Sequence, residues 1–303
     1  MKQHAIAFGR GLIQLVALAA IAASMATVAF AEDERIERLS GQDRELAEYM
    51  KAFISDMDAK YFDRVGEMNG ELVFEDRTAE TDWSGYDLRV TRGEVMEKAG
   101  RMLSQGKKQN PARGDKELVW SRFYSLDMHP KTPLVGMLHA TIVVQFFADG
   151  SSSTGGWLGV MPGTKIAEDL DSLKELTDAY FAEADKDPSL YRRLMCKGTE
   201  DTVFEFRRKP ACSGVSFYGP PVYRGSTEDS LKFIAGLFDE FVDAYVDITE
   251  KRADQAYSEA DLLAQDKMRK SWLIDQLFSD PFASAIVPFE VWSFANVPPV
   301  IKF

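Results

Sequence analysis

The chain has 303 residues, 45% of them hydrophobic, so it is long enough to bury a full core in one or two domains. Its formal net charge of −12 argues against nucleic-acid binding, which would need a basic face. An anionic ligand would therefore have to meet a local group of arginines or lysines.

The N-terminal segment has the pattern of a secretory signal. Lys2 and Arg10 precede an uncharged apolar run that ends in the small-x-small sequence VAFA. This pattern predicts cleavage after Ala31, so that 1–31 is a signal peptide and 32–303 is one mature domain. The expected location is periplasmic or secreted, with no membrane contact after cleavage. The alternative is a retained anchor, because the run is about long enough to cross a bilayer.

The apolar periodicity predicts an α+β domain. In chain order, we expect a helix over 42–63, loops over 64–118, strands over 119–128 and 136–147, a Gly/Ser-rich loop over 150–156, a helix over 166–185, a strand and a turn over 203–218, and helices over 228–250 and from about Ser258. A short segment with two prolines joins the first two strands, which favours an antiparallel pair. No internal repeat and no linker is evident.

Two cysteines, Cys196 and Cys212, are present in the whole chain. In an oxidising compartment they could form a disulfide, and two buried free thiols are the alternative. Their spacing fits no zinc motif, because no second pair of ligands lies nearby in the sequence.

The hairpin WSRFYSLDMHPKTPLVGMLHATIVVQFF carries most of the candidate chemistry. Strand alternation places five side chains on one side of its first strand: Ser121, Phe123, Ser125, Asp127 and His129. On its second strand, alternation separates His139, Thr141, Val143 and Gln145 from an apolar face of Leu138, Ala140, Ile142, Val144 and Phe146.

The two histidines of the hairpin are the only ones after residue 31. Histidine is the side chain best suited to proton transfer near neutral pH. The alternative is a pair of hydrogen-bonded structural histidines. We expect no metal, because a stable site usually needs three or four ligands and no carboxylate stands at a diagnostic spacing.

The segment HPKTPLVGMLH resembles the aerobic coproporphyrinogen III oxidases, which carry His-Pro-Lys/Arg-Asn-Pro and a second histidine ten residues after the first. Ser125 matches the family's substrate-contacting serine, four residues before the first histidine. Other segments similar to the family's occur in the same order along the chain, from about residue 42 to 300. They are RGEVMEKAG at 92–100, GGWLG at 155–159, AYVDITEKR at 244–252 and the single residue Asp280.

The resemblance implies an antiparallel sheet flanked by helices, assembled as a homodimer. The family converts two propionates of coproporphyrinogen III to vinyl groups of protoporphyrinogen IX, with O2 as co-substrate and no organic cofactor. By this resemblance we expect His139 and Asp280 to be catalytic. The substrate-binding residues are then expected to be Ser125, His129, Thr141 and Arg122.

The sequence departs from the family at positions expected to contact the substrate. Thr141 and Val143 stand where the family has Asn and Arg, and that Arg would grip a carboxylate by a bidentate contact. Arg122, Arg207 and Arg208 are candidates to replace it. These departures keep two alternatives open. One is an exported module that binds porphyrin or haem, with His129 or His139 as axial ligand. The other is a protein that keeps only the fold and acts through its dimer surface.

Overall fold

The computed structural model describes residues 34–111, 114–200, 210–278 and 287–302. The chain divides into two compact units, residues 1–38 and 39–303. The first contains the short 3-10 helix η1, Glu34–Arg38. All features below belong to the second unit. The predicted signal peptide lies outside the described residues.

A seven-stranded antiparallel sheet organises the second unit, and its strands follow one another in chain order. They are β1 (Glu75–Glu80), β2 (Ser84–Thr91), β3 (Met96–Gly106), β4 (Leu118–Pro130), β5 (Met137–Phe147), β6 (Ser152–Met161) and β7 (Val215–Ser216). Helices flank the sheet, so the protein has the predicted α+β class. The predicted hairpin is confirmed as β4 and β5.

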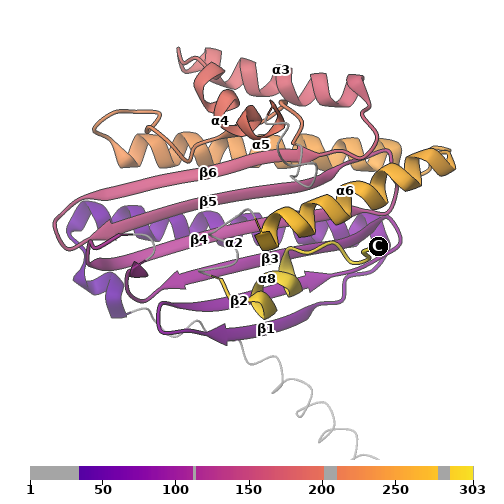
Figure 1. Ribbon diagram of the computed structural model, residues 1–303. Helices are drawn as coiled ribbons and strands as arrows, with labels where there is room; N and C mark the ends of the chain where they lie inside the picture. The colour runs from indigo at the N-terminus through magenta and orange to yellow at the C-terminus, as the bar shows by residue number, and fades with distance from the viewer. Residues whose placement is uncertain (1–33, 112–113, 201–209, 279–286, 303) are drawn as a thin grey trace, which may run out of the picture. The chain divides into compact units, whose positions relative to one another are not determined.

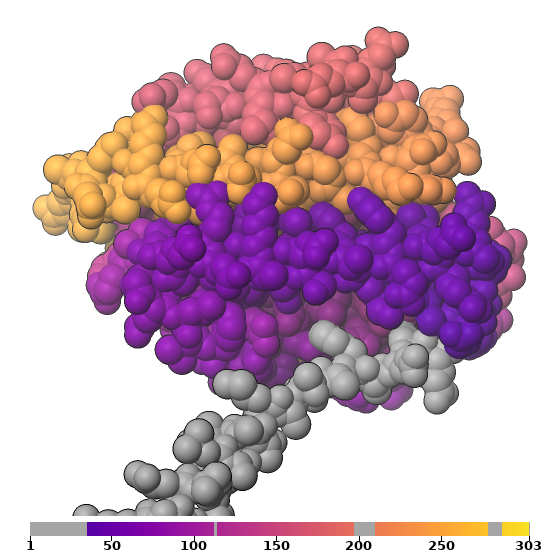
Figure 2. Space-filling model, turned by 180° about the vertical axis from the view of Figure 1, so that it is seen from behind, coloured from indigo at the N-terminus to yellow at the C-terminus, as the bar shows by residue number. Residues whose placement is uncertain are grey.

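Helices cover both faces of the sheet. They are α2 (Gly41–Asn69), α3 (Ala167–Glu183), α4 (Ser189–Glu200), α5 (Thr227–Arg252), α6 (Glu259–Phe278) and α8 (Phe289–Ala295). Helices α6 and α8 lie in front of the sheet in Figure 1. Helices α2 and α5 run side by side over the opposite face, which Figure 2 shows from behind.

The face under α2 and α5 is an aromatic and aliphatic core. Phe238 of α5 packs on Phe53 of α2 and on Tyr124 of β4, with ring centroids 5.6 and 5.8 Å apart. Apolar residues at helical spacing in 42–63 and 228–250 are buried, such as Leu46, Met50, Leu231 and Phe241. Amphipathic periodicity therefore identified this core correctly.

The prediction of loops over 64–118 is wrong, because β1, β2 and β3 lie there. Strand β1 is a largely exposed edge strand whose residues are polar except for Ala79, and β3 buries Lys98 and Arg101. Neither strand therefore shows the apolar-polar alternation that marks a half-buried strand.

The predicted loop over 150–156 is also wrong from Ser152 onward, where β6 begins. Its glycines are needed for close packing. A Cβ atom on Gly156 would lie 2.6 Å from the Thr141 carbonyl oxygen. The strand predicted within 203–218 is reduced to β7, and 201–209 lies outside the described residues.

A disulfide joins Cys196 of α4 to Cys212, with the Cα atoms 5.7 Å apart. It closes a loop with a sequence separation of 16, which in the chain-entropy model adds about 3 kcal/mol of stability. In the described part of the chain, no helix is long and apolar enough to cross a membrane.

Candidate functional site

The two polar rows of the hairpin lie on the same face of the sheet, the one under α6 and α8. In the β4–β5 register Asp127 is directly opposite His139, and Ser125 is directly opposite Thr141. Apolar clusters stand on either side of this polar group. One contains Leu88, Met102 and Phe294, and the other contains Met137, Trp272 and Trp292.

Asp127 and His139 form a carboxylate–imidazole pair. The distance from His139 Nδ1 to Asp127 Oδ1 is 2.7 Å. The Asp127 side chain is fully buried, whereas 18% of the His139 side chain is exposed. Because an ionised carboxylate only accepts hydrogen bonds, Nδ1 carries the proton and Nε2 is left with its lone pair. Within the described residues His139 Nε2 makes no hydrogen bond, so this nitrogen is available to a ligand.

Two further groups hold the Asp127 carboxylate. Its Oδ2 accepts hydrogen bonds from Ser125 Oγ at 3.2 Å and from the side-chain amide of Asn296. The same amide nitrogen donates to Ser125 Oγ at 2.7 Å. The buried carboxylate therefore has three hydrogen-bond donors around it: Ser125, Asn296 and His139.

His129 has a different environment from His139. It is 1% exposed, and its Nε2 donates to the Asn296 carbonyl oxygen at 3.0 Å. Burial, together with the positive charges of Lys98 and Arg269, lowers the pKa of His129 well below its ordinary value. His129 is therefore a neutral structural residue at physiological pH.

Lys98 of β3 completes the polar group. It is 2% exposed, and its Nζ donates to the Val297 carbonyl oxygen at 2.6 Å. Burial, reinforced by the charge of Arg92, lowers the pKa of Lys98 to about 7, and the Asp127 carboxylate opposes this shift. Lys98 is thus about half protonated at neutral pH. It is directly opposite His129 in the β3–β4 register.

Aromatic side chains lie beside His139. Gly159 pairs with His139 across β5 and β6, and a Cβ atom on Gly159 would lie 2.7 Å from the indole nitrogen of Trp157. The indole therefore covers the strand position next to the imidazole. Two residues along β5, Thr141 Oγ1 is 2.9 Å from the hydroxyl oxygen of Tyr218, which is 48% exposed.

The structure brings together four of the six predicted site residues: Ser125, His129, His139 and Thr141. Of these only His139 reaches the surface, since each of the others is at most 1% exposed. The direct substrate contacts expected of these three buried residues do not fit this geometry. Ser125 and His129 support the Asp127–His139 pair instead, and Thr141 holds Tyr218.

Arg122 does not join the site. It follows Ser121 on β4, so strand alternation directs it to the opposite face, where its guanidinium lies over the Trp120 ring at 4.6 Å. It is 4% exposed, which leaves no room for a carboxylate ligand. Asp280, Arg207 and Arg208 lie outside the described residues.

Sequence reasoning passed over two residues of the site. Asp127 was already on the same strand face as Ser125 and His129, and that parity was the available signal. Asn296 had none, because it lies 169 residues from Asp127 along the chain. No local pattern reports a contact of that range.

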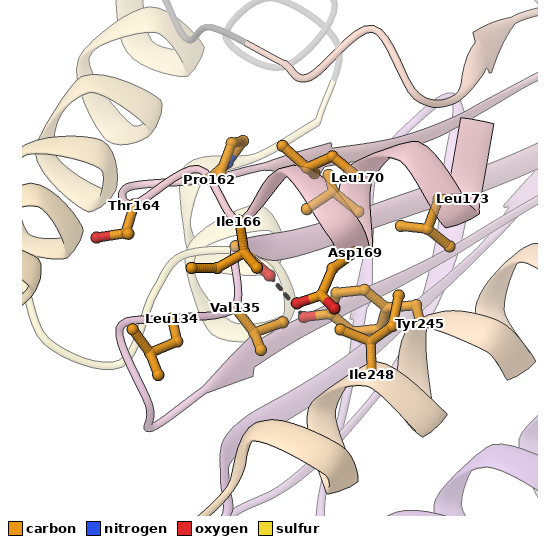
Figure 3. Close-up of a pocket in the computed structure, with 12 residues that line it drawn as sticks. Leu134, Val135, Pro162, Thr164, Ile166, Asp169, Leu170, Leu173, Tyr245 and Ile248 are labelled. Carbon is orange, nitrogen blue, oxygen red and sulfur yellow. Dashed lines mark hydrogen bonds between the residues drawn. The ribbon is translucent and has the colours of Figure 1, made fainter. Parts of the chain in front are cut away.

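The described residues contain no group of three His, Cys, Asp or Glu side chains placed to hold a metal ion. A separate cavity of about 20 Å³ lies between α3 and α5 (Figure 3). Its walls are mainly apolar, and the Tyr245 hydroxyl beside it donates to the Gly136 carbonyl oxygen at 2.7 Å. The cavity has room for about one water molecule and not for a tetrapyrrole.

No family model matches the chain.

Proposed function

We propose that the protein is an oxidoreductase related to the aerobic coproporphyrinogen oxidases, which acts on the propionates of a tetrapyrrole with O2 as co-substrate. The observation that supports this most is the Asp127–His139 pair. A buried carboxylate fixes the imidazole, and the free nitrogen of that imidazole is at the partly exposed end. This arrangement is the one expected of a general acid–base residue.

Conversion of one propionate to a vinyl group releases CO2 and passes two electrons to O2, which becomes hydrogen peroxide with two protons. One of those protons comes from the methylene carbon that loses its hydrogen, and the other comes from solvent. In this proposal His139 Nε2 accepts the methylene proton and passes it on. Asp127 stabilises the imidazolium that forms, as a buried carboxylate does in other acid–base pairs.

Trp157 and Tyr218 supply the surface on which a flat macrocycle would rest. The indole of Trp157 lies at the strand position next to His139, and Tyr218 contacts Thr141, two residues further along β5. Large aromatic side chains favour stacked contacts with other rings. The homodimer that the resemblance implies belongs to the same proposal. Light scattering of the mature protein tests it.

Haem or porphyrin binding without turnover is the second candidate. It is favoured by the Nδ1–H bond to Asp127, because a carboxylate partner on the far nitrogen is what orients a histidine and strengthens it as a ligand to a metal. In that case His139 Nε2 is the axial ligand. His129 is excluded from this role by its burial and by its bond to the Asn296 carbonyl.

One set of variants separates the two candidates. The mature protein and His139→Ala are incubated with coproporphyrinogen under air and, separately, titrated with haemin. Gln145→Ala is the matched control, since Gln145 lies on the same face of β5 but six residues further along. The oxidase proposal expects a vinyl product from the parent and from Gln145→Ala, and none from His139→Ala.

A red-shifted Soret band that depends on His139, without turnover, contradicts the oxidase proposal and supports the binding module. Absence of both signals leaves the protein with the fold alone and removes both candidates.

A further inference from the structure

We propose that the C-terminal segment Ala295–Val297 is a latch that fixes the Asp127–His139 pair, with Asn296 as its positioning residue. The inference deepens the proposed function, because it says what sets the orientation of the imidazole that would react. The latch itself can be tested without any tetrapyrrole.

The segment makes its polar contacts with the residues that surround the pair. The Asn296 amide donates to Asp127 Oδ2 and to Ser125 Oγ, and the Asn296 carbonyl accepts from His129 Nε2. One residue later, the Val297 carbonyl accepts from Lys98 Nζ. Two consecutive residues thus bind four side chains on strands β3 and β4.

The Asn296 amide is present for its N–H donors. In the described structure its Oδ1 is buried without a hydrogen-bond partner, which costs free energy. Its Nδ2, in contrast, is used twice. The N–H donors of Asn296 therefore act on the Asp127 carboxylate and its neighbour Ser125, while its side-chain oxygen stays unsatisfied.

The sheet is shaped to receive the latch. Gly100 of β3 is directly opposite Asp127 in the register, and a Cβ atom at Gly100 would lie 1.9 Å from the Ala295 carbonyl oxygen. Any side chain there would push the backbone of the segment away from the sheet. The glycine therefore lets the backbone at Ala295 approach the sheet closely enough for Asn296 to reach Asp127.

Removal of the latch takes one hydrogen-bond donor away from the buried Asp127 carboxylate. Asp127 Oδ2 would keep only the Ser125 hydroxyl, and a buried carboxylate that loses a donor tends to rotate or to take up a proton. The charged and titratable groups nearest to it are His139, His129 and Lys98, with Arg269 acting on His129. Either response frees His139 Nδ1, so the imidazole is no longer held in one tautomer.

The test is the tautomer of His139, read from the 15N shifts of its two ring nitrogens in the mature protein at a pH where the ring is neutral. The spectrum is simple because only two histidines follow residue 31, and His139→Gln assigns the signals. The parent should show a protonated Nδ1 and an unprotonated Nε2. Asn296→Leu removes the donors, and Gly100→Ala displaces the segment without changing a polar group.

Both variants should give averaged shifts of mixed tautomers, and Asn296→Leu should lower turnover about 10- to 100-fold, the loss usual for an outer-shell partner. Gly85→Ala on β2 is the matched control. Its new Cβ atom would be 3.9 Å from the nearest atom, an ordinary contact, so the parent tautomer should persist.

If Asn296→Leu, folded by its circular dichroism spectrum, keeps the parent tautomer, the latch is refuted whatever happens to activity. If Gly100→Ala does not fold, Asn296→Ser provides the second variant. If the tautomer changes but the parent shows no turnover, the latch stands and the proposed oxidase function fails. The two inferences therefore fail in different experiments.

Discussion

The two faces of the β4–β5 hairpin are built from alternate residues of the same strands, yet they are held together differently. Toward α2 and α5, residues such as Leu126, Ala140 and Ile142 pack in an apolar core. Toward α6 and α8, the cross-strand pairs Asp127–His139 and Ser125–Thr141 are polar, and all but His139 are buried as deeply.

This comparison shows that alternation of polar and apolar residues does not always mean one solvent-exposed face and one buried face. Here both faces are covered by helices. The apolar face is stabilised by the area that it removes from water, whereas the polar face depends on specific donors for each acceptor. A substitution on the apolar face should therefore act on stability, and one at the Asp127–His139 pair on chemistry.

Asp127→Asn should have the largest effect. An amide at this position can donate to His139 Nδ1 and so select the wrong tautomer, as in other pairs of this kind. We expect turnover to fall by about two to four orders of magnitude, measured as conversion of coproporphyrinogen under air. Activity within threefold of the parent would show that the pair does not act in proton transfer.

Phe238→Ala should have the next largest effect, this time on stability. It leaves a cavity against Phe53 and Tyr124, which costs about 3 to 5 kcal/mol in free energy of unfolding. Chemical denaturation measures the loss. At a temperature where the variant is folded, its turnover should match that of the parent, and a large loss there would break the division between the faces.

Lys98→Met should reveal the cost of a buried amine through its pH dependence. Below a pH of about 10.4 the unfolded lysine is protonated, whereas the folded one, with its pKa lowered to about 7, takes up its proton only near neutrality. The free energy of unfolding of the parent should therefore fall as pH decreases from 10 to 7 and level off below.

Lys98→Met lacks this slope. The free energy of unfolding of Lys98→Met, relative to that of the parent, should increase by about 3 kcal/mol as pH decreases from 10 to 7, after allowance for relaxation around the amine. Denaturation curves at four pH values measure it. Parallel curves for the two proteins would show that Lys98 titrates normally in the fold.

Thr141→Val should have the smallest effect. It keeps the shape of the side chain and removes the hydrogen bond to the Tyr218 hydroxyl, which costs about 1 kcal/mol or less because Tyr218 is half exposed. KM for the tetrapyrrole should rise a few-fold with kcat little changed. An equal fall in kcat would place Tyr218 in the chemistry rather than in binding.

The sequence predicts the helices α2 and α5 and the hairpin well, because their apolar periodicity is sustained over many residues. It also separates the polar side chains of β4 and β5 from the apolar ones. It does not give the hairpin register, which depends on the geometry of the connection, and so it cannot pair His139 with Asp127.

Strands β1 and β3 escape sequence analysis for a different reason. The buried cations of β3 are paired by tertiary contacts: Arg101 with Asp58 and Asp87, and Lys98 with the C-terminal segment. Strand β1 is a largely exposed edge strand, so it lacks an apolar face. Arg122 shows the opposite error, a cation assigned to the site that strand parity alone already places on the other face.

The most direct test of the difference between the two faces compares His139→Ala with Ile142→Ala, two substitutions on opposite faces of β5. Turnover and melting temperature are measured on both. We expect His139→Ala to abolish turnover and to stay within a few degrees of the parent melting temperature. Ile142→Ala should melt several degrees lower and turn over normally when folded. Full turnover by His139→Ala, or a collapse of its stability equal to that of Ile142→Ala, would contradict this expectation.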